Sequence, residues 1–189
     1  MAFTDSRRLT GPNVYFNLPA AVLETRNGSV NREQIEQWQT HVCRLADSLG
    51  WPAPVCHAQT HAKGATLAFT APIDQLYVAT EINEWAWQAV CDEIELAAPA
   101  FPDIHDLNMA ISSFRRMAAC EREPELIELM RAAERLAWPV LLDDDSFSVG
   151  FGSQTCIWPR TALPVGDGLP KDRVMALPVA MVTGSNGKT

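Results

Sequence analysis

The junction between an apolar run and a glycine-rich segment constrains the fold of this chain more than any other feature. Residues 174–182 are almost continuously apolar, as in a strand buried within a parallel sheet. This run leads directly into Thr-Gly-Ser-Asn-Gly-Lys-Thr, residues 183–189. A buried strand followed by glycines and Gly-Lys-Thr is the pattern of a phosphate-binding loop. The sequence therefore predicts the first strand and the loop of a P-loop domain, truncated at the loop.

Each residue type in this loop suits the binding of phosphate. Glycines let backbone N–H groups close around phosphate oxygens, and Lys188 supplies a positive charge to the β- and γ-phosphates. The Thr189 hydroxyl is positioned to ligate Mg²⁺. We therefore expect ATP and Mg²⁺ as cofactors. The predicted nucleotide-binding residues are Gly184, Ser185, Asn186, Gly187, Lys188 and Thr189.

The residues before this segment predict an α/β fold of the α+β kind, with about four helices packed on a small mixed sheet of short strands. The clearest helix begins at Asn31, which can form a capping pair with Gln34, and ends before Gly50. Three further helices are expected over residues 83–97 and 103–118 and from Pro124 onward. Strands are expected around residues 22–23 and over 55–61, 65–70, 76–82, 139–142, 147–151 and 155–158. Residues 76–82 could instead begin a long helix that runs from Pro72, but their β-forming residues favour a strand.

A change of composition divides the chain. Prolines and glycines are concentrated between residues 159 and 173, where they interrupt regular structure. We therefore expect a domain over residues 1–158, a linker over 159–173 and the start of an ATP-binding domain over 174–189. Hydrophobic residues make up 47% of the chain, which is enough for a packed core in the first domain.

Charge limits the partners that the chain can bind. Its 23 acidic and 15 basic residues give a net charge of −8, which argues against coating of nucleic acid or of an anionic membrane. The acidic excess lies between Glu81 and Asp145, a stretch with fifteen acidic and five basic residues. A solvated acidic face that keeps the protein soluble is the simplest interpretation. The same stretch could also contact cationic groups such as arginine side chains.

The five cysteines have no paired spacing, and the first residues lack the apolar core of a signal peptide. No stretch approaches the length of an apolar membrane span. We therefore expect a cytoplasmic protein with free thiols. Cys56 and His57 would point to opposite faces of a strand, which disfavours a zinc site. The aspartates at 143–145 follow a predicted strand, where a turn favours this residue type without any metal.

The short loop Thr-Gly-Ser-Asn-Gly-Lys-Thr resembles the loop of the Mur ligases, the ATP-dependent amide ligases that build the peptidoglycan peptide. It differs from the general P-loop pattern at Val182, which stands where that pattern has its first glycine. The resemblance implies that the complete protein activates a carboxylate with ATP and Mg²⁺ and then couples it to an amine.

Several earlier segments resemble the N-terminal domain of cyanophycin synthetases, in the same order along the chain. They are Arg8–Asn13, Leu76–Val90, Ser113–Glu128, Pro139–Asp144 and Val149–Gly152. The resemblance covers most of residues 7–158. Cyanophycin synthetases place an ATP-grasp domain between this region and their Mur-like domain, whereas here only the predicted linker intervenes. The resemblance therefore implies a cyanophycin-synthetase-like Mur ligase without the ATP-grasp domain.

In that family the N-terminal domain is thought to hold the growing polymer near the active sites. The resemblance implies that residues 1–158 hold an amino-acid or peptide substrate or act as a scaffold, with no catalytic residue in this chain. We expect residues 1–189 alone to be inactive, because they lack the helix after the loop and the substrate-joining part. Guanidinium groups suit carboxylates, so the candidate substrate contacts are Arg7, Arg8, Arg115 and Arg116.

Two other functions stay open. Residues 1–158 could be a stand-alone binding module for a charged peptide or polymer, without ATP chemistry. The loop could instead belong to an unrelated P-loop kinase or NTPase. The sequence determines neither which carboxylate and amine are joined nor whether the complete protein is a homo-oligomer.

Overall fold

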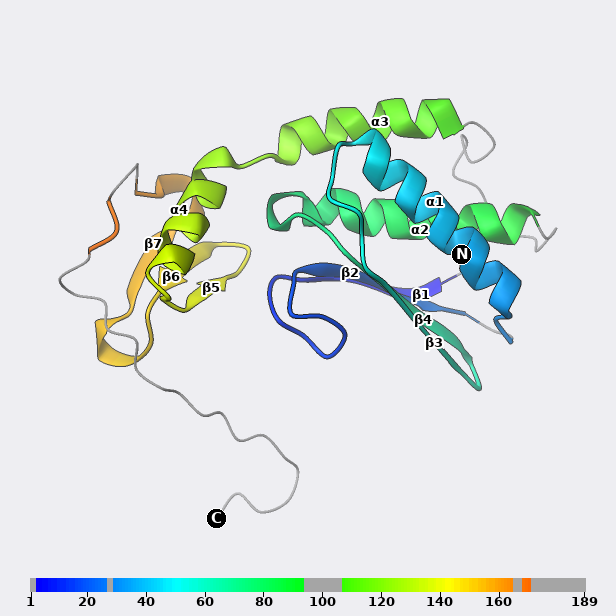
Figure 1. Ribbon diagram of the computed structural model, residues 1–189, viewed down its shortest axis with the longest axis horizontal. Coiled ribbons are helices and arrows are strands. Elements are labelled where there is room, and N and C mark those ends of the chain that lie inside the picture. The colour runs from blue at the N-terminus through cyan, green and yellow to red at the C-terminus, as the bar shows by residue number, and fades with distance from the viewer. Residues whose placement is uncertain (1–2, 27–28, 94–106, 165–167, 171–189) are drawn as a thin grey trace, which may run out of the picture. The chain divides into compact units, whose positions relative to one another are not determined.

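The computed structural model describes residues 3–26, 29–93, 107–164 and 168–170, with side chains up to Cys91 in the second range. The chain divides into two compact units, residues 1–122 (unit 1) and residues 123–189 (unit 2), each described by itself below (Figure 1). The predicted strand and phosphate loop over 174–189 lie outside the described residues, as does part of the predicted linker 159–173. The predicted division of the chain at residue 158 therefore stays a prediction.

Unit 1 is built on a four-stranded antiparallel sheet (Figure 1). The hairpin formed by its last two strands, residues 56–70, turns at Lys63-Gly64, where Gly64 has a φ of +148°. A Cβ at Gly64 would lie 2.5 Å from the Thr25 hydroxyl oxygen, so only glycine fits where the hairpin approaches the second strand. The strands are β1 (Phe3–Leu9), β2 (Ala20–Thr25), β3 (Cys56–His61) and β4 (Gly64–Thr70), in the spatial order β1-β2-β4-β3.

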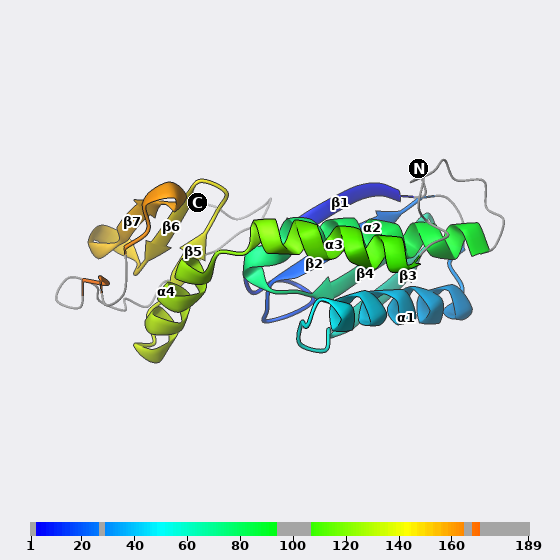
Figure 2. The same ribbon diagram turned by 90° about the horizontal axis from the view of Figure 1, so that it is seen from above.

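Three helices lie on one side of this sheet, the third of them farther from the strands and packed on the other two, as Figures 1 and 2 show. They are α1 (Arg32–Ser48), α2 (Leu76–Glu93) and α3 (Leu107–Glu121). The capping box expected at the start of α1 is present, with hydrogen bonds of 2.9 Å in both directions between Asn31 and Gln34. None of the helices in the described ranges is long and apolar enough to cross a membrane.

The core of unit 1 lies between the sheet and these helices. Leu23 of β2 lies opposite Leu67 of β4, and both side chains are fully buried. Trp38 of α1 is also fully buried, and its indole N–H donates a 2.9 Å hydrogen bond to Oδ1 of Asn83 in α2. Asn83 in turn donates to the Leu67 carbonyl oxygen at 3.2 Å. This chain of contacts links α1, α2 and β4 in the interior.

Unit 2 contains, within its described residues, one α-helix and a three-stranded antiparallel meander. Phe147 and Val149 of the central strand are fully buried in one cluster with Leu126 and Leu129 of the helix. This cluster is the core of the unit. The elements are α4 (Pro124–Arg135), β5 (Val140–Leu142), β6 (Ser146–Val149) and β7 (Cys156–Pro159), with the strands in the order β5-β6-β7.

The structure confirms the α+β class and the helix that begins at Pro124. It corrects the prediction of a single mixed sheet, because the strands within the described residues form two separate sheets in which every pair is antiparallel. Short connections such as those between β3 and β4 and between β5 and β6 allow only antiparallel pairing of the strands they join.

The strand predicted over residues 76–82 is wrong, because these residues form the first turns of α2. Residues 83–93 of the helix predicted over 83–97 continue the same element, and residues 94–97 lie outside the described residues. Leu76, Ala79 and Ile82 recur at helical spacing and are 3%, 0% and 0% exposed. Burial of this face against the core therefore outweighs the strand preference of the local sequence.

The first strand, β1, was not expected from the sequence. Its residues Asp5, Arg7 and Arg8 give no apolar alternation, the usual signal of a half-buried strand. Among the described strands, β1 pairs only with β2 and lies at the edge of the sheet. Charged side chains are common on edge strands, because they discourage pairing with other chains.

Candidate functional site

The predicted phosphate loop, residues 184–189, lies outside the described residues. The assignment of ATP to this loop and of Mg²⁺ to Thr189 therefore stays a prediction. The described residues do include the four arginines expected to contact substrate carboxylates. All four belong to unit 1, and their surroundings differ.

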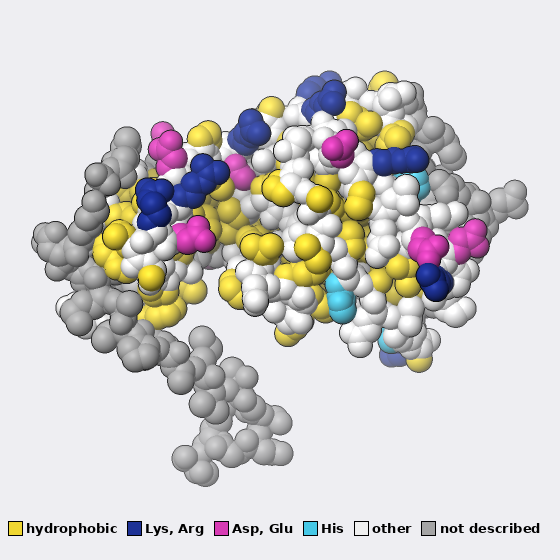
Figure 3. Space-filling model, viewed as in Figure 1, with side chains coloured by type: hydrophobic (Ala, Val, Ile, Leu, Met, Phe, Trp, Pro, Cys, Tyr) yellow, Lys and Arg dark blue, Asp and Glu magenta, His cyan; other side chains and the backbone are white. Residues whose placement is uncertain are grey.

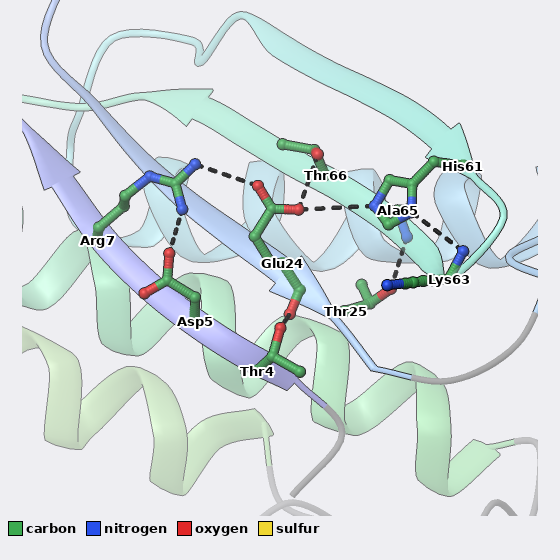
Figure 4. A network of polar contacts seen from close by, with 9 residues as sticks. All are labelled: Thr4, Asp5, Arg7, Glu24, Thr25, His61, Lys63, Ala65 and Thr66. Carbon is green, nitrogen blue, oxygen red and sulfur yellow. Dashed lines mark hydrogen bonds and ion pairs between the residues drawn. The ribbon is translucent and has the colours of Figure 1, made fainter.

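Arg7 lies on β1, on the sheet face that is turned away from the helices (Figure 4). Its guanidinium group forms ion pairs with Asp5 and with Glu24, the second with an Nη2–Oε1 distance of 3.1 Å. Burial works to lower the pKa of Arg7, but the hydrogen bonds to the two carboxylates outweigh it and leave the pKa above its ordinary value. The positive charge of Arg7 is thus matched by the chain's own carboxylates.

Glu24 is the centre of this polar network, which joins the strands of the sheet (Figure 4). Besides Arg7 on β1, its carboxylate accepts a 2.9 Å hydrogen bond from the Thr66 hydroxyl on β4. Nε2 of His61, at the end of β3, lies 3.7 Å from Oε2 of Glu24. A substrate carboxylate would have to displace Glu24 or Asp5 to reach Arg7. We conclude that this network stabilises the sheet.

Arg8 points to the opposite face of β1, toward α2. Its guanidinium carbon lies 3.6 Å from the centroid of the Tyr77 ring, a cation–π contact. The carboxylate of Glu121, at the end of α3, accepts hydrogen bonds from the backbone N–H groups of Tyr77 and Val78 at 2.7 and 2.9 Å. Glu121 therefore caps the first turn of α2, and Arg8 lies beside this cap.

The pKa of the capping carboxylate, Glu121, is itself shifted. Burial raises the pKa of Glu121 above its ordinary value, against the lowering effect of the two backbone hydrogen bonds. The negative charge of Asp74 adds to the increase, and the positive charge of Arg8 opposes it. Arg8 thus has a role within the protein, because it favours the charged form of the capping carboxylate.

Arg115 and Arg116 are adjacent on α3, and both are exposed. Nε of Arg115 donates a 3.0 Å hydrogen bond to the Ser48 carbonyl oxygen, at the end of α1. The four arginines therefore do not gather at one place. On the face of unit 1 drawn in Figure 3, basic side chains are separated by apolar and uncharged surface. Because Arg115 and Arg116 are exposed, they are better placed than Arg7 and Arg8 to contact a substrate carboxylate.

The segment Arg8–Asn13, which resembles cyanophycin synthetases, covers the end of β1 and the start of the loop between β1 and β2. Asn13 organises this loop, because its Oδ1 accepts 2.9 Å hydrogen bonds from the backbone N–H groups of Tyr15 and Phe16. Its Nδ2 donates to the carbonyl oxygens of Gly11 and Leu18 at 3.0 and 2.9 Å. The side chain thus replaces backbone hydrogen bonds that a regular hairpin would make.

The same loop places aromatic rings against β3. The centroids of the Tyr15 and His57 rings lie 5.2 Å apart, and Phe16 meets His57 edge to face at 6.5 Å. Nε2 of His57 is buried and has no hydrogen-bond partner among the described residues. Sequence reasoning considered His57 only as a metal ligand and missed Tyr15, Phe16 and Glu24. A glutamate within the apolar strand sequence Ala-Ala-Val-Leu-Glu-Thr was the available signal for the network.

The structure also places the residues considered for metal binding. Among the described residues, no three or more His, Cys, Asp or Glu side chains are arranged to hold a metal ion. Asp143 instead accepts hydrogen bonds from the backbone N–H groups of Asp145 and Ser146 at 2.9 and 2.6 Å. The bond from Asp145, with those from Ser146, lowers the pKa of Asp143. This aspartate therefore shapes the turn between β5 and β6, as expected for its position.

A scan against protein-family models and a search among curated proteins each found no match for this chain. The resemblance to Mur ligases and cyanophycin synthetases therefore rests on the sequence segments given above and stays a prediction. The described residues add the placement of the four arginines and the structural role of Asn13.

Proposed function

We propose that the complete protein is an ATP-dependent carboxylate–amine ligase of the Mur type, with this chain as its N-terminal part. The observation that carries the proposal is the sequence Thr-Gly-Ser-Asn-Gly-Lys-Thr at residues 183–189, directly after an apolar run. The segments that resemble cyanophycin synthetases precede this loop in the order found in that family. Such a protein works in the cytoplasm, where ATP is available, and needs neither nucleic acid nor a membrane as partner.

The residues of the loop have separate roles in this proposal. Bound ATP with Mg²⁺ would supply the phosphoryl group that activates a carboxylate for attack by an amine. Backbone N–H groups of residues 184–187 would surround phosphate oxygens, and Lys188 would balance the charge of the β- and γ-phosphates. The Thr189 hydroxyl would ligate the metal ion.

The region before the loop would hold an amino-acid or peptide substrate. Arg115 and Arg116 support this role, because both are exposed and lie on one helix. A guanidinium group binds a carboxylate through two parallel hydrogen bonds, which favours arginine over lysine at such a contact. Arg7 and Arg8 are less suited, since the first pairs with two carboxylates and the second packs on Tyr77.

The proposal is tested on the complete protein by measuring ADP release with panels of amino acids and short peptides. Lys188→Ala should lower ATP turnover by a factor of about 100 or more, because it removes charge stabilisation from the transferred phosphoryl group. Arg26→Ala, another change of a basic residue outside the loop, serves as the control. Turnover of Lys188→Ala at the wild-type rate, or the absence of any ATP binding by the wild type, would contradict the proposal.

Substrate holding is tested separately from ATP chemistry. Arg116→Ala should raise the KM for the carboxylate substrate about tenfold with little change in kcat, because a contact made equally in the ground and transition states is lost. Arg116→Lys should restore only part of the affinity. Arg122→Ala, which removes an exposed arginine just beyond α3, should leave KM unchanged. An unchanged KM in Arg116→Ala would remove this residue from the substrate site.

A further inference from the structure

Strand β3 pairs on one side only within the described sheet of unit 1. It is the outermost strand beyond β4, in the spatial order β1-β2-β4-β3 (Figure 1). The last three residues of β3, Gln59, Thr60 and His61, are exposed. A strand at the edge of a sheet presents a row of backbone N–H and C=O groups to which another strand can pair. β3 is therefore a place where unit 1 can extend its sheet.

The register of β3 on β4 determines which backbone groups face outward. The Thr70 N–H donates a 3.0 Å hydrogen bond to the Val55 carbonyl oxygen, which places a hydrogen-bonded position at residue 55. Such positions alternate with non-hydrogen-bonded ones in an antiparallel pair, so every second residue from 55 to 61 bonds to β4. The backbone N–H and C=O groups that point toward the open edge belong to the intervening residues Cys56, Ala58 and Thr60.

The two edges of the sheet differ in what would oppose pairing with another chain. β1 carries the charged residues Asp5, Arg7 and Arg8, and its register on β2 shifts near the start of the strand. Charges and an irregular register both discourage further pairing at an edge. β3 has the sequence Cys-His-Ala-Gln-Thr-His, without Lys, Arg, Asp, Glu or Pro, and its register on β4 is continuous. Of the two edges, β3 is thus the one open to a further strand.

We propose that two copies of this chain pair through their β3 strands, antiparallel and about a twofold axis at Ala58, and so join their four-stranded sheets into one. Ala58 then lies opposite the partner's Ala58, and Cys56 lies opposite the partner's Thr60. In this register the outward-facing groups at positions 56, 58 and 60 all bond in both copies. A shift by one residue would set outward groups of one copy against residues of the other that already bond to β4.

The side chains that this register brings together suit a pair of identical strands. His57 lies opposite the partner's Gln59, and Val55 lies opposite the partner's His61, so acidic or strongly basic side chains nowhere face each other. Val55 is 56% exposed, and the partner strand would remove part of this apolar surface from water. The two copies therefore meet without charge repulsion and with some apolar burial.

A second copy is favoured over a flexible peptide as the occupant of this edge. In both copies β3 is already extended and held by β4, so pairing orders little further backbone. A free peptide would lose conformational entropy as it became a strand. A twofold arrangement also repeats each contact, because a bond between residues i and j recurs between j and i. The pairing is independent of the proposed ATP chemistry.

The oligomeric state and the hydrogen exchange of the full chain test the proposal together. Sedimentation should show a particle of twice the 20.8 kDa chain mass. Over a dilution series, the amides of Cys56, Ala58 and Thr60 should exchange faster as the dimer dissociates, whereas the amide of His57, which is bonded to β4, should not change. A monomer at about 100 μM chain would overturn the proposal. A dimer in which the three amides exchange at the monomer rate would also overturn it, because another surface would then be the interface.

A proline at position 60 removes one outward-facing donor and leaves those bonded to β4 in place. Because the donor is lost in both copies, Thr60→Pro should raise the Kd of the dimer roughly thirtyfold. Thr60→Val keeps the N–H and the branched side chain, so it should dimerise at least as tightly as the wild type. A dimer of Thr60→Pro as tight as that of the wild type would contradict the proposal. The exchange data on the wild type decide the outcome even where the proline impairs folding.

Discussion

Both units pack helices against one face of an antiparallel sheet, but the chemistry of the other face differs between them. In unit 1 that face carries paired charges, with Arg7 and Glu24 in contact across β1 and β2. In unit 2 it carries Leu141 and Ile157, which are 58% and 66% exposed and lie on either side of Ser148 in the sheet register. The face of a sheet that is turned away from the helices can thus carry either ion pairs or a few isolated apolar side chains.

The cores of the two units also differ in extent. Within the described residues, the unit 1 cluster contains 22 buried residues and the unit 2 cluster contains six, so burial stabilises unit 1 more. Within the described residues, three helices lie on one side of the first sheet and one packs on the second. We therefore expect unit 1 to unfold at a higher denaturant concentration than unit 2.

The largest effect is expected from Trp38→Ala. It empties a fully buried site and leaves the Asn83 side chain without its indole donor, so unit 1 should lose about 4 kcal/mol of unfolding free energy. Urea titration followed by NMR signals of each unit measures the loss. Trp38→Phe should cost less because it keeps most of the volume. An equal shift in the signals of both units would contradict their separation.

Phe147→Ala tests the smaller core in the same way. Phe147 is fully buried in the cluster of unit 2, and its removal should cost about 3 kcal/mol. Because this core is small, the change should unfold unit 2 at room temperature while the unit 1 signals stay native. Retention of cooperative unfolding in unit 2 would show that residues outside the described ranges stabilise it.

The unfolding free energies of the two units should change with pH in opposite directions. The pKa of Glu121 is raised above its ordinary 4.5, first by burial, so the folded chain holds this proton to a higher pH than the unfolded chain does. Unit 1 therefore loses stability as pH rises from 4.5 through the folded pKa. In unit 2, hydrogen bonding lowers the pKa of Asp143 below 3.8, so its contribution is present above pH 3.8 and lost as pH falls further.

Variants at Glu121 test both the cap and the titration. Glu121→Gln should flatten the pH dependence of unit 1 between pH 4 and 7, as measured by urea titration at each pH. Glu121→Ala should in addition cost about 1 kcal/mol, because the first N–H groups of α2 lose their acceptor. Glu125→Gln, an exposed control in unit 2, should leave the unit 1 profile unchanged. If the unfolding free energy of unit 1 changes with pH equally in the wild type and in Glu121→Gln, Glu121 is excluded as the source of that change.

The smallest effect is expected on the open face of unit 2. Leu141→Thr and Ile157→Thr should each change the unfolding free energy of unit 2 by less than about 0.5 kcal/mol, because both side chains are already largely exposed. Thermal unfolding followed by the near-ultraviolet signal of the tryptophans measures the change. A loss above 1 kcal/mol in either variant would show that this face is covered in solution.

Local patterns predicted the elements whose signals lie within a few residues. The capping box at Asn31 and the first position of Pro124 marked the starts of α1 and α4 correctly. The strand expected over 76–82 failed, because its β-forming residues are placed on a helix that is buried along its length. Whether an apolar segment is buried as a helix or as a strand depends on residues far away in the sequence. The neighbouring residues alone therefore do not determine it.

In the candidate site, too, features formed by neighbouring residues could be predicted and contacts between distant residues could not. The phosphate loop could be predicted directly from residues 183–189, because a loop of this kind is formed by neighbouring residues. The four arginines could be named from the sequence, but their partners could not. Arg7 meets Glu24 through strand pairing, and Arg8 meets Tyr77 through packing of α2 beside β1.

The sequence by itself determined the α+β class, the helix starts and the phosphate-loop pattern, since each depends on residue types at short, fixed spacings. Only the tertiary structure decided that Glu24 joins the strands of the sheet and that Glu121 caps α2. These contacts join residues on different elements. Their geometry follows from strand register and helix packing, which are fixed only when the whole core assembles.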